Sequence, residues 1–209
     1  MSTQGEKNDF DLAMQDVRGA FRLLYVYTRR ILDVMKYVSA RLNTSYKGGW
    51  PKYSTPSPKS GSGYLESWAW DWLNMYFYEF NFHPIGINHY DFSILLQSDT
   101  GFWDGECSEL AVESYTSIEQ SKTRLIFILG NGYWNIEEFK QDSRLKPTGK
   151  YEFRINAPDE EGDGYMLCKI FDIKDFIDRE TAEKSLSAYI AYLNLKENGI
   201  YDIKLKELE

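Results

Sequence analysis

The sequence has few of the residues that usually build catalytic or metal centres. Its 209 residues contain only two cysteines, Cys107 and Cys168, and only two histidines, His83 and His89. Such sparse cysteine use favours a reducing compartment, although a disulfide between the two stays open. No run of about 18 apolar residues occurs, as a membrane-spanning helix would need. The polar N-terminal segment lacks the apolar core of a secretory signal. We therefore expect a cytoplasmic location and no membrane contact.

Recognisable catalytic motifs are also missing. There is no P-loop that would cradle a phosphate and no G-x-S-x-G nucleophile elbow. His83, His89 and Asp91 form an H-x5-H-x-D pattern whose ligand types suit zinc or iron. Two histidines in a turn are more often solvated, and Cys107 lies in an acidic run that disfavours a thiolate. The sequence predicts no catalytic residue, no metal ligand and no cofactor.

One enzymatic alternative stays open. Nucleases with two carboxylates and a lysine hold Mg²⁺ and an attacking water. Their acid-x-Lys pattern recurs in this chain and is best placed at Asp172–Lys174, where a predicted strand ends, with Asp91 or Glu79 as the upstream acid. Because the pattern is frequent in any charged protein, a metal-dependent nuclease or other nucleic-acid-processing protein is only the alternative function.

Residues 9–43 predict one long amphipathic helix. Steps of four and three residues, with a gap at Thr28, separate Phe10, Met14, Val17, Phe21, Leu24, Ile31, Met35, Val38 and Leu42. This heptad pattern is typical of a coiled-coil or dimer seam. It also suits a helix that packs on its own sheet, which a second apolar set along the segment favours. The length, roughly 50 Å at 1.5 Å per residue, favours a partner instead.

The remaining chain predicts a sheet between two helices. Residues 45–64 are rich in Gly, Ser and Pro, carry no acid and predict a basic surface loop. A sheet over 66–173 would contain strands 70–82, 89–97, 122–129, 150–156 and 165–172. Short helical segments are predicted over 135–142 and, at the end, over 178–198.

Aromatic residues concentrate in residues 66–83, ESWAWDWLNMYFYEFNFH. Their alternation predicts a half-buried strand at the centre of the sheet. The fold prediction is one α+β domain over 1–209, with the long N-terminal helix and the C-terminal helix packed on a mainly antiparallel sheet of about five strands.

Charge is distributed unevenly. The net charge is −8, yet residues 17–65 contain nine basic residues and one acid, Asp33, which makes that segment +8. The other residues then carry 15 basic and 31 acidic groups, a balance of −16. Such sign asymmetry indicates a charged partner.

The basic residues define a predicted partner-binding surface. Arg22, Arg29 and Lys36 repeat every seven residues and share one helix stripe with Arg18. The following segment places lysines beside aromatic residues, which suits stacked bases and phosphates. The complete predicted set is Arg18, Arg22, Arg29, Lys36, Lys47, Trp50, Lys52 and Tyr53.

The predicted function is a non-enzymatic interaction or regulatory module. It would bind an acidic macromolecular partner through the basic helix face and loop, and self-associate as a homodimer through residues 10–42. The acidic remainder of the chain repels phosphate, so we expect a protein partner or a second copy before nucleic acid.

Overall fold

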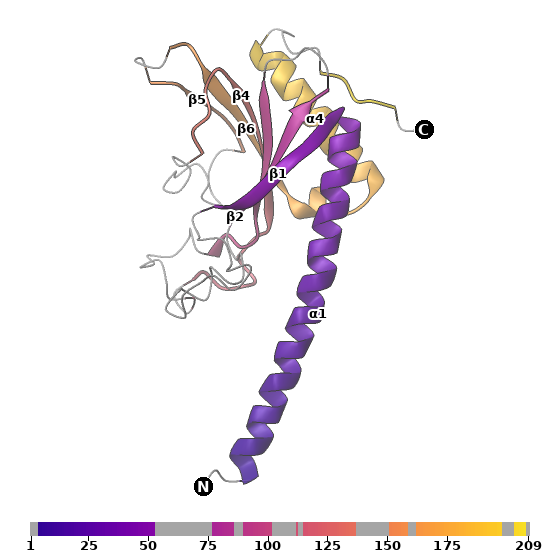
Figure 1. Ribbon diagram of the computed structural model, residues 1–209, viewed down its shortest axis with the longest axis vertical. Helices are drawn as coiled ribbons and strands as arrows, with labels where there is room; N and C mark the ends of the chain where they lie inside the picture. The colour runs from indigo at the N-terminus through magenta and orange to yellow at the C-terminus, as the bar shows by residue number, and fades with distance from the viewer. Residues whose placement is uncertain are drawn as a thin grey trace. The chain divides into compact units, whose positions relative to one another are not determined.

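The computed structural model describes residues 4–52, 77–85, 90–101, 112, 115–136, 151–158, 162–197 and 203–207. The helices are α1 (Gln4–Arg41), the 3-10 helix η5 (Ile173–Phe176) and α4 (Arg179–Glu197). The strands are β1 (Thr44–Lys52), β2 (Phe77–Pro84), β3 (Asp91–Gln97), β4 (Arg124–Asn131), β5 (Glu152–Asn156) and β6 (Tyr165–Asp172) (Figure 1). The chain divides into two compact units, Met1–Val38 and Ser39–Glu209.

All six strands belong to one antiparallel sheet with the order β1-β2-β3-β4-β6-β5. The predicted α+β class, with an N-terminal helix, a C-terminal helix and an antiparallel sheet, is confirmed. The predicted hairpin of the last two strands is confirmed as the β5–β6 pair. Within the described residues there are six strands, where the sequence predicted about five.

The additional strand is β1, which occupies the first part of the predicted 45–64 loop. Glycine and proline, which indicated a loop, are compatible with this strand because it lies at the sheet edge. An edge strand has a neighbouring strand on one side only, so the missing N–H of Pro51 is tolerated there. Lys47 is the extra residue of a bulge, because Tyr46 faces Phe82 while Gly48 already faces Asn81. Gly48 has φ of 150°, a conformation that glycine adopts without strain. Residues 53–64 lie outside the described residues.

The aromatic stretch continues into β2, which begins at Phe77, and residues 66–76 lie outside the described part. β2 lies between β1 and β3, one strand from the edge, so the prediction of a central strand was wrong. Phe80 and Phe82 are buried on one face, and Phe77 and Glu79 are buried on the other. Strand order depends on pairing between distant segments, which the aromatic pattern of one strand does not contain.

The other elements lie close to their predicted positions. The last four predicted strands correspond to β3, β4, β5 and β6, and α4 begins one residue later and ends one residue earlier than predicted. Asp178 caps α4, because its carboxylate accepts a hydrogen bond from the Thr181 N–H at 2.8 Å. Of the predicted helix over 135–142, residues 135 and 136 are not helical, and the others lie outside the described residues.

Different elements cover the two faces of the sheet. On one face Phe127 of β4 lies 5.1 Å from Tyr189 of α4 and 5.7 Å from Phe176 of η5, between ring centroids. On the other face an apolar cluster includes Leu95, Ile128 and Met166. Tyr133 and Ile136, which follow β4, belong to that cluster, and Trp134 packs against it. Both faces of the central strands are therefore buried, as the uninterrupted apolar sequence of β4 requires.

Replacing the ring at the centre of the helix-covered face tests this packing. Phe127 is 0 % exposed, so Phe127→Ala should lower the free energy of unfolding by about 3–5 kcal/mol in urea denaturation. Leu195→Ala on α4 is the control, because Leu195 is 82 % exposed and its loss should change that free energy by less than about 0.5 kcal/mol. Equal effects of the two variants would contradict the core described here.

Candidate partner-binding surface and sheet cavity

The predicted basic residues of α1 lie on one side of the helix. At 3.6 residues per turn, Arg18, Arg22, Arg29 and Lys36 fall within about 40° of each other around the helix axis. All four are exposed. Lys36 pairs with Asp33 at 3.8 Å, a surface contact that contributes little to stability. The three arginines make no salt bridge with another described residue, so their charge is available to a partner.

The predicted residues of β1 have separate roles. Lys47, in the bulge, is exposed, and Trp50 is 50 % exposed. Lys52 instead directs its ammonium group towards the buried Glu79 and forms a salt bridge of 3.2 Å. Tyr53 lies outside the described residues. The structure therefore places Lys47 and Trp50 at the surface, whereas Lys52 is occupied with an internal carboxylate.

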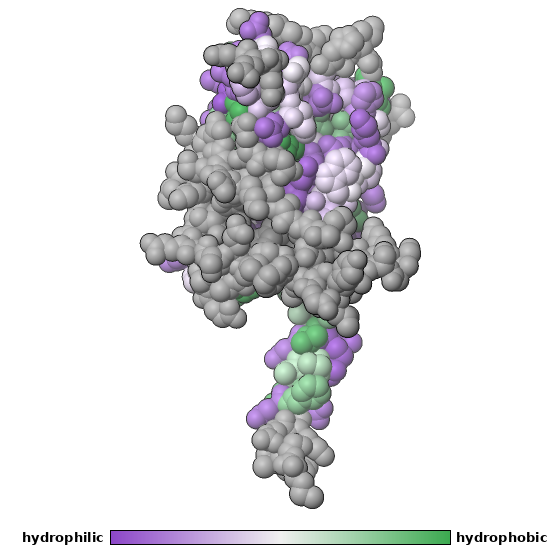
Figure 2. Space-filling model, turned by 60° about the vertical axis from the view of Figure 1, so that its left-hand side comes forward, coloured by the Kyte–Doolittle hydropathy of each residue, from purple (hydrophilic) through white to green (hydrophobic). Residues whose placement is uncertain are grey.

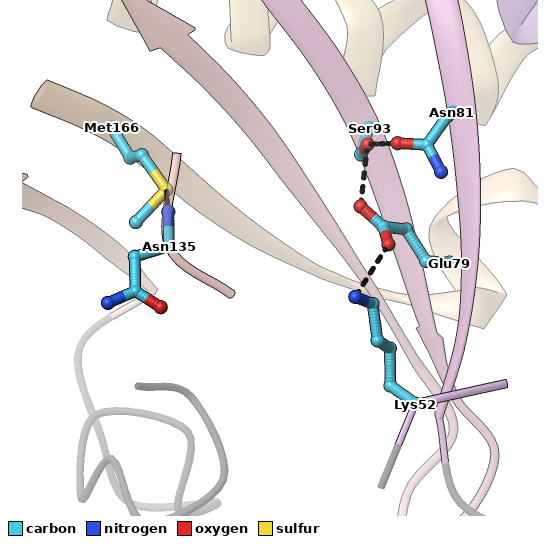
Figure 3. A network of polar contacts seen from close by, with 6 residues as sticks. All are labelled: Lys52, Glu79, Asn81, Ser93, Asn135 and Met166. Carbon is cyan, nitrogen blue, oxygen red and sulfur yellow. Dashed lines mark hydrogen bonds and ion pairs between the residues drawn. The ribbon is translucent and has the colours of Figure 1, made fainter. Parts of the chain in front are cut away.

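The Lys52–Glu79 pair begins a polar network across three strands (Figure 3). Glu79 is 1 % exposed, and the Ser93 hydroxyl lies 3.1 Å from its Oε1 and 2.6 Å from Asn81 Oδ1. A hydroxyl donates one proton at a time, so Ser93 serves one of these acceptors at each moment. Buried charge is costly without such partners, and the network therefore fixes how β1, β2 and β3 align.

Beside this network a cavity of about 330 Å³ opens on the sheet face opposite α4. Its polar and aromatic lining comes from Lys47, Gly48, Trp50, Asn81, Asp91 and Trp134. Phe82 and Phe92 also border it, but their side chains contact each other and, for Phe92, Tyr189 on the α4 side. All of these residues belong to the unit Ser39–Glu209.

Glycine and a backbone contact position Trp134 at this cavity. A Cβ on Gly130 would lie 2.6 Å from Cε3 of Trp134, so the indole rests on β4 only because position 130 has no side chain. The next residue, Asn135, donates its backbone N–H to Sδ of Met166 on β6 at 3.4 Å (Figure 3). Trp134 is thus held over the sheet although it lies outside any strand.

An exposed carboxylate borders the cavity beside Asn81. Asp91 lies two residues before Ser93, which is the β3 partner of Asn81. Nδ2 of Asn81 has no hydrogen-bond partner among the described residues, but it is buried and presents no surface to the cavity. The cavity therefore offers a carboxylate acceptor and two indoles.

The carboxylates of the nuclease alternative do not converge. Asp91 and Asp172 are at opposite ends of the sheet, because Asp91 aligns through Gly130 with Met166, six residues or about 20 Å along β6. Asp172 instead pairs with Lys174 at 3.3 Å and with Lys122 at 3.7 Å. Glu79 lies three strands away from β6 and neutralises Lys52. This geometry gives the nuclease alternative no assembled metal site.

The structure describes only some of the candidate histidines and cysteines. His83 is exposed at the end of β2, and His89 and Cys107 lie outside the described residues. Within the described ranges no three metal-ligating side chains gather. Cys168 is buried in β6.

The resolved pKa shifts mainly concern tyrosines. Burial raises the pKa of Tyr78, with a further contribution from Tyr46, and raises that of Tyr115 to about 12. Burial also raises the pKa of Tyr192, whose hydroxyl donates to the Phe153 carbonyl at 3.0 Å. These hydroxyls stay protonated at neutral pH and act as donors instead of bases.

Sequence reasoning missed Asn81 and Trp134 and considered Asp91 only as a metal ligand. The β2–β3 register aligns Asn81 with Ser93, two residues from Asp91, and the bulge at Lys47 aligns Gly48 with Asn81. Trp134 lies outside the strands and is positioned by Gly130 and by the contact of Asn135 with Met166. One sequence reveals neither the register nor these contacts.

Comparison with known proteins identifies a family without indicating an activity. A family model described as PM0109 matches residues 7–198, most of the chain, and the chain therefore belongs to the PM0109 family. No curated protein and no solved structure gives a match. In the described part of the chain, neither helix combines the length and apolarity needed to cross a membrane.

The salt bridge under the cavity can be tested by a pair of substitutions. Lys52→Met leaves the Glu79 carboxylate buried without its cation, so it should lower the free energy of unfolding by about 3 kcal/mol. Adding Glu79→Gln removes that unpaired charge and should restore part of the loss. Urea denaturation of both single variants and the double variant measures the coupling, and strictly additive losses would contradict a buried pair.

Proposed function

We propose that this member of the PM0109 family is a non-enzymatic interaction module that self-associates through α1 and binds an acidic macromolecule through the arginines of that helix. One observation carries the proposal: α1 exposes large apolar side chains together with three arginines that make no salt bridge with another described residue. The sparse cysteine content, two in 209 residues, supports the cytoplasmic location expected from the sequence.

The apolar exposure of α1 is extensive. The large apolar side chains exposed on this helix are Phe10, Leu12, Val17, Phe21, Leu23, Leu24, Tyr25, Val26 and Leu32. An aromatic side chain presents on the order of 150–250 Å², so the three exposed aromatic residues alone present about 300–450 Å². This equals the largest apolar patch of a typical monomer, before the aliphatic residues are added. Figure 2 shows one side of α1, where apolar and polar atoms intermingle.

The seam predicted from the heptads is part of this exposed surface. Phe10, Val17, Phe21 and Leu24 are 62 %, 42 %, 61 % and 48 % exposed. By contrast, the later seam positions Ile31, Met35 and Val38 are buried. The first half of the seam therefore has the apolar surface that a second helix needs for knobs-into-holes packing.

Charge along α1 favours a second copy in antiparallel orientation. Residues 9–16 contain three acids, Asp9, Asp11 and Asp16, and no base. Residues 17–36 contain five bases and one acid. An antiparallel pair places the acidic segment of each copy beside the basic segment of the other, whereas a parallel pair places like charges together.

The arginine stripe supplies the second part of the proposed function, and in the dimer an acidic partner competes for it with Asp9, Asp11 and Asp16 of the second copy. Arg18, Arg22 and Arg29 form a single stripe and make no salt bridge with another described residue. A stripe of cations attracts acidic peptides or nucleic acids over about 8–10 Å at ordinary salt concentrations. We therefore expect the acidic partner along α1, with a protein partner preferred because the rest of the chain is acidic.

Sedimentation velocity tests self-association. The wild-type chain should form a dimer at tens of micromolar, and Phe21→Glu with Leu24→Glu should produce monomers, because two charges then enter the apolar seam. The matched control is Ile177→Glu with Leu195→Glu, which makes the same chemical change at exposed positions of the other unit and should leave the dimer intact. A wild-type monomer at the highest attainable concentration would contradict the proposal.

Binding to acidic probes tests the arginine stripe. Replacing Arg18, Arg22 and Arg29 by Gln should weaken binding of poly-glutamate about tenfold at low salt, and the remaining affinity should depend less on salt. Replacing the exposed Arg179, Lys184 and Lys196 of α4 by Gln removes the same charge and should have little effect. Binding of a single-stranded oligonucleotide but not poly-glutamate would assign the stripe to nucleic acid instead. Equal weakening by both triple variants would show that only net charge matters.

A further inference from the structure

The cavity between Trp50 and Trp134 goes beyond the proposed function of α1. It lies entirely within Ser39–Glu209 and requires neither the dimer nor the arginine stripe. A volume of about 330 Å³ is small among ligand sites, which typically measure about 300–1,000 Å³. It therefore fits one ring system with short substituents, and not a folded segment of another protein.

The aromatic residues of the cavity are positioned for stacking. Trp50 remains 50 % exposed, while the Lys52 ammonium lies 5.8 Å from its ring centroid and is held there by Glu79. Trp134 rests on Gly130, which no residue with a side chain could replace without displacing the indole. Flat apolar surfaces fixed in this way suit a planar ligand ring.

A polar group complements the edge of such a ring. The Asp91 carboxylate, which is exposed at the cavity, accepts hydrogen bonds only. A nucleobase edge presents N–H donors, so a base in the cavity can donate to Asp91.

Lys47 adds a cation at the same cavity. It is the bulged residue of β1, exposed and part of the cavity lining. A neutral sugar could use the indoles and the carboxylate, but it would gain nothing from this charge. A phosphate attached to a base would pair with the lysine.

We propose that this cavity binds one nucleotide unit, with the base stacked on Trp50, its edge bonded to Asp91, and its phosphate beside Lys47. The unit is either a free mononucleotide or one residue of a single-stranded nucleic acid, since both present the same base and phosphate.

Titration of the full-length protein distinguishes these contributions. The probes are the four ribonucleoside monophosphates, their nucleosides, ribose 5-phosphate, inorganic phosphate and a short single-stranded oligonucleotide, followed by tryptophan fluorescence and calorimetry. Nucleotides should quench the fluorescence, and ribose 5-phosphate and inorganic phosphate should not. In the chain with Arg18, Arg22 and Arg29 replaced by Gln, tighter binding of the oligonucleotide than of every mononucleotide identifies nucleic acid as the source, and the reverse order identifies free nucleotides.

Three substitutions separate the base from the phosphate. Trp50→Ala should weaken nucleotide binding about tenfold, because one stacking surface is lost. Lys47→Gln should weaken nucleotides about threefold and leave nucleosides unchanged. Asp91→Asn should weaken the amino-bearing bases relative to uridine monophosphate, because an acceptor-only group is replaced. Lys184→Gln on α4 is the matched control for charge and should change nothing.

The outcome that would overturn the proposal is also measurable. If Trp50→Ala retains the wild-type far-UV circular dichroism and binds nucleotides as tightly as the wild type, the cavity is not the site. If glucose or another neutral sugar quenches the fluorescence and nucleotides do not, the ligand class is wrong. The Phe21→Glu, Leu24→Glu chain should bind nucleotides normally, so failure of self-association and failure of this site are distinguishable.

Discussion

The buried charge of Glu79 is the constraint on which the candidate cavity depends. This carboxylate is 1 % exposed on β2, and Lys52 of β1 neutralises it at 3.2 Å. Neutralisation requires β1 to align with β2 in one register, because a shift by one residue would turn Lys52 to the other face. The same register places Trp50 opposite Glu79 and Gly48 opposite Asn81. The ion pair thereby positions the wall of the cavity as well as the edge of the sheet.

The two units present different chemistry. In Ser39–Glu209 the apolar residues of the central strands are buried, with α4 over one face of the sheet and the segment after β4 over part of the other. In Met1–Val38 large apolar side chains from Phe10 to Leu32 remain exposed beside an arginine stripe. Burial stabilises apolar surface by about 25 cal/mol per Å², so such an exposed helix gains from a partner, whereas the central strands of the sheet are already covered. The proposed functions follow this division, with association assigned to α1 and small-ligand binding assigned to the sheet.

Local periodicity made most of the elements predictable. The heptads of α1, the alternating pattern of β5 and the apolar β4 each carry their own signal, and the structure contains all three elements. The strand β1 was not predicted, because Gly48, Gly49 and Pro51 reduce strand propensity except at a sheet edge or a bulge. Whether a strand lies at an edge is a property of the whole sheet.

The candidate site was predicted in part. Lys47 and Trp50 were selected from composition and do line a cavity, whereas Lys52, chosen for the same reason, neutralises Glu79.

The sequence by itself determined the helices, most strands and the concentration of positive charge in residues 17–65, because each depends on residues close together in the chain. Only the tertiary structure decided which side chains meet. Asn81, Asp91 and Trp134 come from β2, β3 and the segment after β4, and the bulge at Lys47 aligns them with Trp50. Strand order and register depend on pairing between distant segments and on burial of both sheet faces, and periodicity within one segment contains neither.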